Sequence, residues 1–158
     1  SPIHLMCRNE FLQHWASAAM IRKPREIRAR SMSGGSSVEA VHELASKHPA
    51  QFTLGLLSAC NALGVGVVLG APEHVFFHDP ERRSLDLLAF GLVSAPEGGL
   101  GSFVIRRPRA PQSLLRGRVQ RGQLWCADVL QCYVDLLQYP VRGMEQSSAI
   151  LDRLRWRA

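Results

Sequence analysis

Residues 127–146, with the sequence ADVLQCYVDLLQYPVRGMEQ, predict two helices joined by a sharp turn. Apolar side chains recur there at the spacing of one helical face, namely Val129, Cys132, Tyr133, Leu136 and Leu137. We expect Asp128 to cap this helix, and Pro140 to end it because a proline ring clashes with the preceding turn. Gly143 allows the turn, and Glu145 opens a second helix. The buried side of that second helix is expected to consist of Ala149, Ile150, Leu151 and Leu154.

Five polar or small residues gather around the turn of this hairpin. They are Gln131, Asp135, Arg142, Gly143 and Glu145. In a structural interpretation, Asp135 pairs with Arg142 across the turn, and Glu145 lies at a helix N-terminus, where a carboxylate is favoured. In a functional interpretation, the same residues bind a ligand or take part in catalysis. Periodicity leaves both interpretations open.

The composition is that of one globular domain. The chain has 158 residues, of which 46% are hydrophobic and 20% are charged, so a single buried core is expected. The four cysteines, Cys7, Cys60, Cys126 and Cys132, form no C-x-x-C motif and lack zinc-ligand spacing. Cys60 and Cys132 lie in apolar patterns and are expected to be buried free thiols. We therefore expect a cytoplasmic protein with no metal or other cofactor.

The segment 49–72 carries no charge and approaches the length of a membrane span. Four glycines and Asn61 interrupt it, however, and its two halves have different patterns. We expect a core helix over residues 53–63, capped by Thr53, and then a core strand over residues 64–69. No contact with a membrane is expected.

The remaining pattern predicts an α/β (α+β) fold, with a small mixed or antiparallel sheet, packed helices and the C-terminal helical hairpin. Residues 1–35 are expected to form an N-terminal linker helix and a basic loop, and residues 36–158 a single α/β domain. Within that domain, Ser36 and Glu39 match a capping box that opens a helix through about Lys47. The buried side of this helix is expected to be Val38, Val41, Leu44 and Ala45.

Further strands are expected over residues 74–78 and 101–106, and a strand pair over 113–125 with Trp125 packing inward. Residues 82–93 fit either a helix or a strand. His74 and His78 fall on one face of the first of these strands, but positions four apart on a strand are separated by about 13 Å. We therefore expect no shared metal ion there.

Arginine dominates the positive charge of the chain. The net charge is +6, and only two of the 19 basic residues are lysines. Residues 98–127 contain no acidic side chain and six arginines, which are Arg106, Arg107, Arg109, Arg116, Arg118 and Arg121. A guanidinium group donates hydrogen bonds in pairs and suits phosphate. The block therefore predicts contact with nucleic-acid phosphates or with an acidic partner, and the alternative is a solvated basic face.

The hairpin stretch resembles the C-terminal signature of the AbiE-type (AbiEi) antitoxin and transcriptional-regulator family, which belongs to the type IV toxin–antitoxin systems. The matching positions are Gln131, Tyr133-Val134-Asp135-Leu136, Pro140, Arg142-Gly143 and Glu145-Gln146, with Ser147 where the family usually has alanine. Three upstream segments are similar to family segments in the same order. They are residues 12–16, 52–59 and 113–117.

The resemblance implies a role in bacterial phage defence by abortive infection. Family members usually join an N-terminal winged helix–turn–helix, which binds operator DNA, to a C-terminal α/β domain that opposes a nucleotidyltransferase-like toxin. We expect this chain to begin after the winged domain, so that its own DNA contacts are made to the phosphate backbone. The resemblance assigns Gln131, Tyr133, Asp135, Arg142, Gly143 and Glu145 to the family motif.

Two other classes of function are compatible with the sequence. The first is a nucleic-acid-processing, nuclease-like enzyme whose acidic site assembles only in the fold. No G-x-S-x-G motif and no E-x-K motif on a strand is present, so we favour a protein without catalytic residues. The second is an interaction module that forms a homodimer through its apolar helices.

Overall fold

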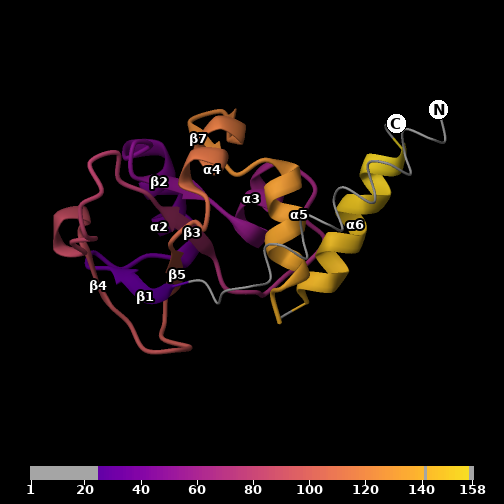
Figure 1. Ribbon diagram of the computed structural model, residues 1–158. Helices are drawn as coiled ribbons and strands as arrows, with labels where there is room; N and C mark the ends of the chain where they lie inside the picture. The colour runs from indigo at the N-terminus through magenta and orange to yellow at the C-terminus, as the bar shows by residue number, and fades with distance from the viewer. Residues whose placement is uncertain (1–24, 141, 157–158) are drawn as a thin grey trace.

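A mixed sheet of seven strands forms the centre of the computed structural model, which describes residues 25–140 and 142–156. The strands lie in the order β4-β1-β5-β3-β2-β7-β6 (Figure 1). Their bounds are β1 Glu26–Ser31, β2 Phe52–Leu54, β3 His74–Phe77, β4 Leu92–Ser94, β5 Phe103–Arg106, β6 Val119–Arg121 and β7 Leu124–Cys126. The pairs β3–β5 and β2–β7 are parallel, and the other neighbours are antiparallel. The predicted α/β fold class is therefore confirmed.

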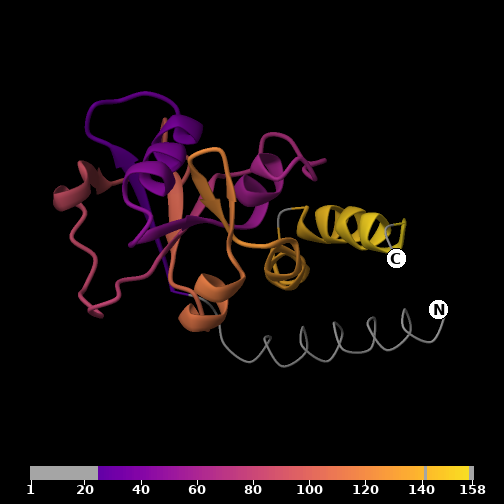
Figure 2. The ribbon, with the colours of Figure 1, turned by 90° about the horizontal axis from the view of Figure 1, so that it is seen from above.

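In this described part of the chain, five α-helices and one 3-10 helix surround the sheet. They are α2 Ser37–Lys47, α3 Leu56–Ala62, α4 Pro111–Gly117, α5 Val129–Leu137, α6 Gly143–Trp156 and η1 Leu88–Phe90. Helix α2 packs against β2 and β7, and α3 packs against β3 and α5. Helices α5 and α6 pack on each other, on the side of the molecule away from β1 and β4 (Figure 1 and Figure 2). None of the helices within 25–140 and 142–156 combines the length and the apolarity needed to cross a membrane.

The core lies around the inner strands and α3. All four residues of β3 and all four of β5 are buried, as expected for parallel neighbours covered on both faces. The first five residues of α3 are also buried, which confirms that this helix is central. Each large apolar side chain buried in this way stabilises the fold by about 1.5–3 kcal/mol.

The helix over residues 53–63 begins later than expected, and Thr53 does not cap it. Thr53 lies in β2, and Gly55 is the N-cap residue of α3. A side chain at position 55 would place its Cβ 2.5 Å from the Phe76 ring, so only glycine fits where the chain turns from strand to helix. The prediction of the cap was therefore wrong, because the hydroxyl of Thr53 instead contacts His78, directly after the neighbouring strand β3.

The prediction of a strand over residues 64–69 was wrong as well. This segment has no strand neighbour, because a side chain pairs with its backbone instead. The fully buried Gln146 donates from Nε2 to the Val65 carbonyl (2.8 Å), and its Oε1 accepts from the Val67 amide (2.8 Å). One glutamine side chain thus supplies the two hydrogen bonds that a neighbouring strand would make, and it joins α6 to the loop after α3.

Residues 26–31, which we expected within a linker, form the inner strand β1 between β4 and β5. Ala29 in this strand is fully buried, and the strand register places Glu26 opposite Arg106. A short alternating strand with arginines at its exposed positions resembles a polar linker in composition, which explains the error. Residues 1–24, within which the N-terminal linker helix was expected, lie outside the described residues.

Three other expectations were met only in part. The capping of α2 by Ser36 is confirmed, since its side chain accepts from the Glu39 amide, but Val38 is 43% exposed. Residues 113–117 belong to α4, and only the later part of 113–125 forms the strand pair β6–β7. Trp125 is half-buried, beneath the guanidinium of Arg118. Residues 82–93 contain both η1 and the start of β4.

The predicted C-terminal hairpin is confirmed. Asp128 caps α5 by accepting from the Gln131 amide (2.7 Å). At the turn, a Cβ on Gly143 would collide with the Leu136 carbonyl oxygen, so the two helices approach closely only because this residue is glycine. The expected pair between Asp135 and Arg142 is not formed, because Arg142 makes a two-pronged ion pair with Glu145 (both distances 2.9 Å).

We predict that Gln146→Leu lowers the free energy of unfolding by about 2–4 kcal/mol, because the buried Val65 carbonyl and the partly buried Val67 amide lose their partner. Urea unfolding followed by circular dichroism measures this change. The matched control is Gln120→Leu on the exposed strand β6, which should change stability by less than about 0.5 kcal/mol. Equal stability of the two variants would contradict the role given to Gln146.

Candidate functional site

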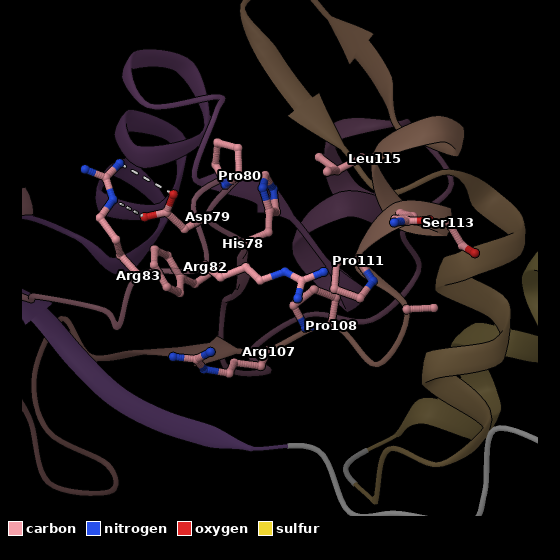
Figure 3. A pocket seen from close by; sticks show the side chains of 13 residues that line it. His78, Asp79, Pro80, Arg82, Arg83, Arg107, Pro108, Pro111, Ser113 and Leu115 are labelled. Atoms are coloured by element: carbon pink, nitrogen blue, oxygen red, sulfur yellow. Dashed lines mark hydrogen bonds and ion pairs between the residues drawn. The ribbon is translucent and has the colours of Figure 1, made fainter.

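A pocket of about 740 Å³ lies between the loop that follows β3 and helix α4 (Figure 3). Its apolar lining consists of Phe77, Pro80, Pro108, Ala110, Pro111 and Leu115. Its charged lining consists of Asp79, Arg82, Arg83 and Arg107. We call this hollow the arginine pocket. It combines ring surfaces with positive charge, a combination that suits flat anionic ligands.

The loop after β3 is fixed by the carboxylate of Asp79. Its Oδ1 accepts from the Glu81 amide (2.9 Å) and its Oδ2 accepts from Nε of Arg83 (2.8 Å). The hydrogen bond from Arg83 holds the pKa of Asp79 below its ordinary value. The charges of Asp79 and Arg83 therefore largely cancel, and the positive potential of the pocket comes from Arg82 and Arg107.

Arg82 has a backbone conformation that arginine rarely adopts. Its φ is +57°, in the left-handed region, which costs a residue with a Cβ about 1–2 kcal/mol. Its amide donates to the Asp79 carbonyl (2.9 Å), which holds the turn in place. Figure 3 shows the side chain extended across the pocket toward Pro111. In the described part of the chain, Arg82 forms no ion pair and no side-chain hydrogen bond.

Arg107 lies on another wall of the pocket, just after β5. Its guanidinium carbon is 5.7 Å from the centre of the Phe77 ring, a distance that allows a cation–π contact. Figure 3 shows the guanidinium groups of Arg107 and Arg82 well apart. The pocket thus offers two separate cations.

A chain of hydrogen bonds connects the pocket to the sheet. Arg118 donates to the Thr53 hydroxyl (3.3 Å) and to the Pro49 carbonyl (2.5 Å), and Thr53 Oγ1 lies 2.8 Å from Nε2 of His78. The other ring nitrogen of His78, Nδ1, must be the donor because it faces the Ala50 carbonyl (3.1 Å). In the neutral imidazole, Nε2 then accepts from the threonine hydroxyl.

Burial and the positive charge of Arg118 lower the pKa of His78 to about 4. His78 is therefore neutral at pH 7, and both of its nitrogens are occupied. The positive charge of the pocket comes from guanidinium groups alone, so it should not change across the physiological pH range.

The six arginines of the predicted basic block separate into two groups. Arg106 is 9% exposed and forms an ion pair with Glu26, with 2.8 Å between Nε and Oε1. Arg118 makes the internal hydrogen bonds described above, and Arg121 donates to the Leu63 carbonyl (3.3 Å). These three arginines contribute to the structure of the domain.

The other three arginines of the block, Arg107, Arg109 and Arg116, are exposed. Within the described residues, none of them forms an ion pair or a side-chain hydrogen bond. Arg107 lines the arginine pocket, Arg109 lies between two lining residues in sequence, and Arg116 follows the lining residue Leu115 on α4. We call these three residues the arginine face.

The family-motif residues lie in the α5–α6 hairpin and do not line the pocket. Gln131 donates to Oδ1 of Asp135 (3.1 Å), Tyr133 is buried, and Arg142 pairs with Glu145 at the turn beside Gly143. Oδ2 of Asp135 is buried without a hydrogen-bond partner in the described residues. Burial raises the pKa of Asp135 to about 6.

A second group of buried polar side chains lies at the start of β3. Nδ1 of His74 faces the Pro72 carbonyl (3.1 Å), whereas Nε2 is buried without a partner among the described residues. Burial and the charge of Arg106 lower the pKa of His74 to about 4. The Ser58 hydroxyl donates to Glu73 and accepts from the His74 amide (2.9 Å). Across 25–140 and 142–156, no three His, Cys, Asp or Glu side chains gather as metal ligands.

Sequence reasoning missed Arg82 and the apolar wall of the pocket. Arg82 lies outside the acid-free block, and its acidic neighbours Asp79 and Glu81 make the segment look electrically balanced. The signal that could have found it is the Asp79-Pro80 turn directly after a buried strand. Comparison with family models, curated proteins and solved structures finds no match for this chain, so the geometry of the pocket is the main basis for a functional conclusion.

We predict that stability falls as the pH is lowered from 6.5 toward 4.5. His74 and His78 have folded pKa values near 4, below the unfolded value of about 6.5, so over this range the unfolded chain binds more protons and is favoured. Each histidine contributes at most about 3 kcal/mol in this way. Urea unfolding at several pH values measures the slope.

Asp135 should oppose this trend, which supplies a control. Its folded pKa of about 6 lies above the unfolded value, so its contribution favours the folded state at low pH and is lost as the pH rises through 6. Asp135→Asn should therefore steepen the fall between pH 6 and 4.5 and raise stability at pH 8. A wild-type stability that stays flat from pH 6.5 to 4.5, with an unchanged slope in Asp135→Asn, would refute both assignments.

Proposed function

We propose that this chain is the effector domain of a bacterial antitoxin and transcriptional regulator, and that it holds nucleic-acid phosphates on the arginine face. The observation that carries this proposal is the division of the basic block. Three of its arginines are used inside the domain. Arg107 lines the pocket, Arg109 and Arg116 are exposed next to lining residues in the sequence, and none of these three has an ion-pair partner in the described residues. Exposed guanidinium groups of this kind bind phosphate through paired hydrogen bonds and release counterions.

The acidic side chains near the pocket do not compete with such a ligand. Asp79 is already neutralised by Arg83. Glu81 lies 3.7 Å from the same arginine and is exposed. A polyanion that approaches the arginine face therefore meets a net positive surface. Contacts of this type position a nucleic acid but do not read its sequence.

The antitoxin part of the proposal is supported by the sequence resemblance of residues 131–147 to the AbiE-type family. It includes a functional link to a nucleotidyltransferase-like toxin and operator DNA as the natural polyanion. A cytoplasmic location is supported by the free, buried thiols of Cys60, Cys126 and Cys132.

We predict that Arg109→Ala/Arg116→Ala weakens the binding of a random-sequence DNA duplex by roughly tenfold at low salt. The slope of log affinity against log salt should fall by about 0.9 for each phosphate that the double variant no longer holds. Electrophoretic mobility shifts across a salt series measure both quantities. The control is Arg30→Ala/Arg153→Ala, which removes the same charge from exposed positions outside the arginine face.

Equal weakening in the two double variants would mean that only net charge matters, which would contradict a defined arginine face. No binding by the wild-type chain at low salt would contradict a role in nucleic-acid binding. Magnesium-dependent cleavage of the DNA would favour the nuclease-like alternative.

A further inference from the structure

The arginine pocket has walls that suit a nucleobase. Pro80, Pro108 and Pro111 contribute rings, and Leu115 and the Phe77 edge complete the apolar surface. A volume of about 740 Å³ falls within the range of about 300–1,000 Å³ found for small-molecule sites. Bases stack on aromatic rings with little dependence on sequence, and the proline rings and Leu115 offer a base an apolar contact surface. In a duplex, however, those faces are covered by neighbouring base pairs.

The two cations of the pocket complement these walls. Arg82 extends across the pocket toward Pro111, while Arg107 lies by Phe77, and Figure 3 shows their guanidinium groups on different walls. A single small anion would gain from two converging guanidinium groups, whereas two separated groups suit successive phosphates of one strand. A base carried between those phosphates would face the proline rings.

The loop that presents Arg82 is held by internal hydrogen bonds that need no ligand. Asp79 accepts from the Glu81 amide and from Arg83, and the Arg82 amide donates to the Asp79 carbonyl. These contacts keep Arg82 in the left-handed region despite its side chain. Strain of this kind is retained where the surroundings over-determine the backbone, and such positions cluster at binding sites. Because the backbone of Arg82 is already held in place, this residue also loses little conformational freedom on binding a ligand.

We infer that the arginine pocket takes one unpaired nucleotide of a single strand whose flanking phosphates are held by Arg82 and Arg107; this inference rests on the proposed function of the arginine face. An acidic peptide fits the pocket less well. Pro80, Pro108 and Pro111 have no N–H to donate to a peptide main chain, and both nitrogens of His78 are already bonded. A base needs only the apolar surface that these residues provide.

The test is the affinity of the chain for a labelled oligodeoxythymidine of about 12 nucleotides and for a duplex of the same length, measured by fluorescence anisotropy at one low salt concentration. Wild-type protein should bind the single strand roughly tenfold more tightly than the duplex. Arg82→Gly should remove most of this preference. Because glycine accepts a positive φ without strain, the unfolding midpoint of Arg82→Gly should equal or exceed that of the wild type, so that weaker binding cannot be attributed to misfolding.

Two further variants separate the pocket from the arginine face. Leu115→Gln keeps the charge but removes part of the apolar wall, and it should weaken single-strand binding by about threefold while leaving duplex binding unchanged. Arg109→Ala/Arg116→Ala should weaken binding to both probes by the same factor. That result, together with the loss of preference in Arg82→Gly, would support the inference.

Three results would overturn it. If Arg82→Gly weakens single-strand and duplex binding equally, the pocket is one more phosphate contact, and the proposed function stands without the nucleotide site. If poly-glutamate competes as well as oligodeoxythymidine at equal charge, the occupant is an acidic polypeptide. If the wild-type chain binds neither probe at low salt, the inference and the proposed function fail together.

Discussion

The guanidinium of Arg118 is the contact on which the architecture around the pocket depends. It extends from the end of α4, lies 4.4 Å from the centre of the Trp125 ring on β7, and donates to Pro49 and to Thr53 on β2. Thr53 then donates to His78 at the end of β3. One half-buried cation therefore positions α4 against three strands, and the arginine pocket lies between α4 and the end of β3. A lysine could not replace it, because a single ammonium group lacks the planar fork that both donates and stacks.

The position of Arg118 also explains why the pocket is positive while His78, which lines it, is neutral. The charge of Arg118 is used by internal acceptors and by the indole ring, and it disfavours a proton on His78. Asp79 forms an ion pair with Arg83 and accepts from the Glu81 amide, which fixes the loop. What remains for a ligand is Arg82 and Arg107, which the fold holds apart on separate walls. The strained backbone of Arg82 then has a structural cause in the contacts of Asp79, and its side chain extends across the pocket (Figure 3).

Much of the fold could be predicted from local signals. The hairpin of α5 and α6, its cap at Asp128 and the cap of α2 at Ser36 follow from side-chain spacing and from short-range hydrogen bonds. The strand expected over residues 64–69 failed because its partner is the Gln146 side chain, about 80 positions away. The arginine block is visible in the sequence as a segment without acidic side chains. Its division into arginines with internal partners and arginines without them could not be seen, because those partners lie far away in the sequence, as Glu26 does from Arg106. Arg82 was missed for a similar reason, since only the folded loop shows that Asp79 is paired with Arg83 and not with Arg82.

The proposed nucleotide site requires contact between a nucleic acid strand and the two cations Arg82 and Arg107. Nuclear magnetic resonance of the arginine Nε–H groups, during titration with a short oligodeoxythymidine, is the decisive measurement because each guanidinium gives its own signal. We expect the signals of Arg82 and Arg107 to shift together and to saturate, while that of Arg118 changes little because its guanidinium is half-buried over Trp125 and donates from Nη1 to Pro49 and Thr53. Shifts confined to Arg142 and the α5–α6 turn, with Arg82 and Arg107 unmoved, would refute this contact and place the binding site on the hairpin.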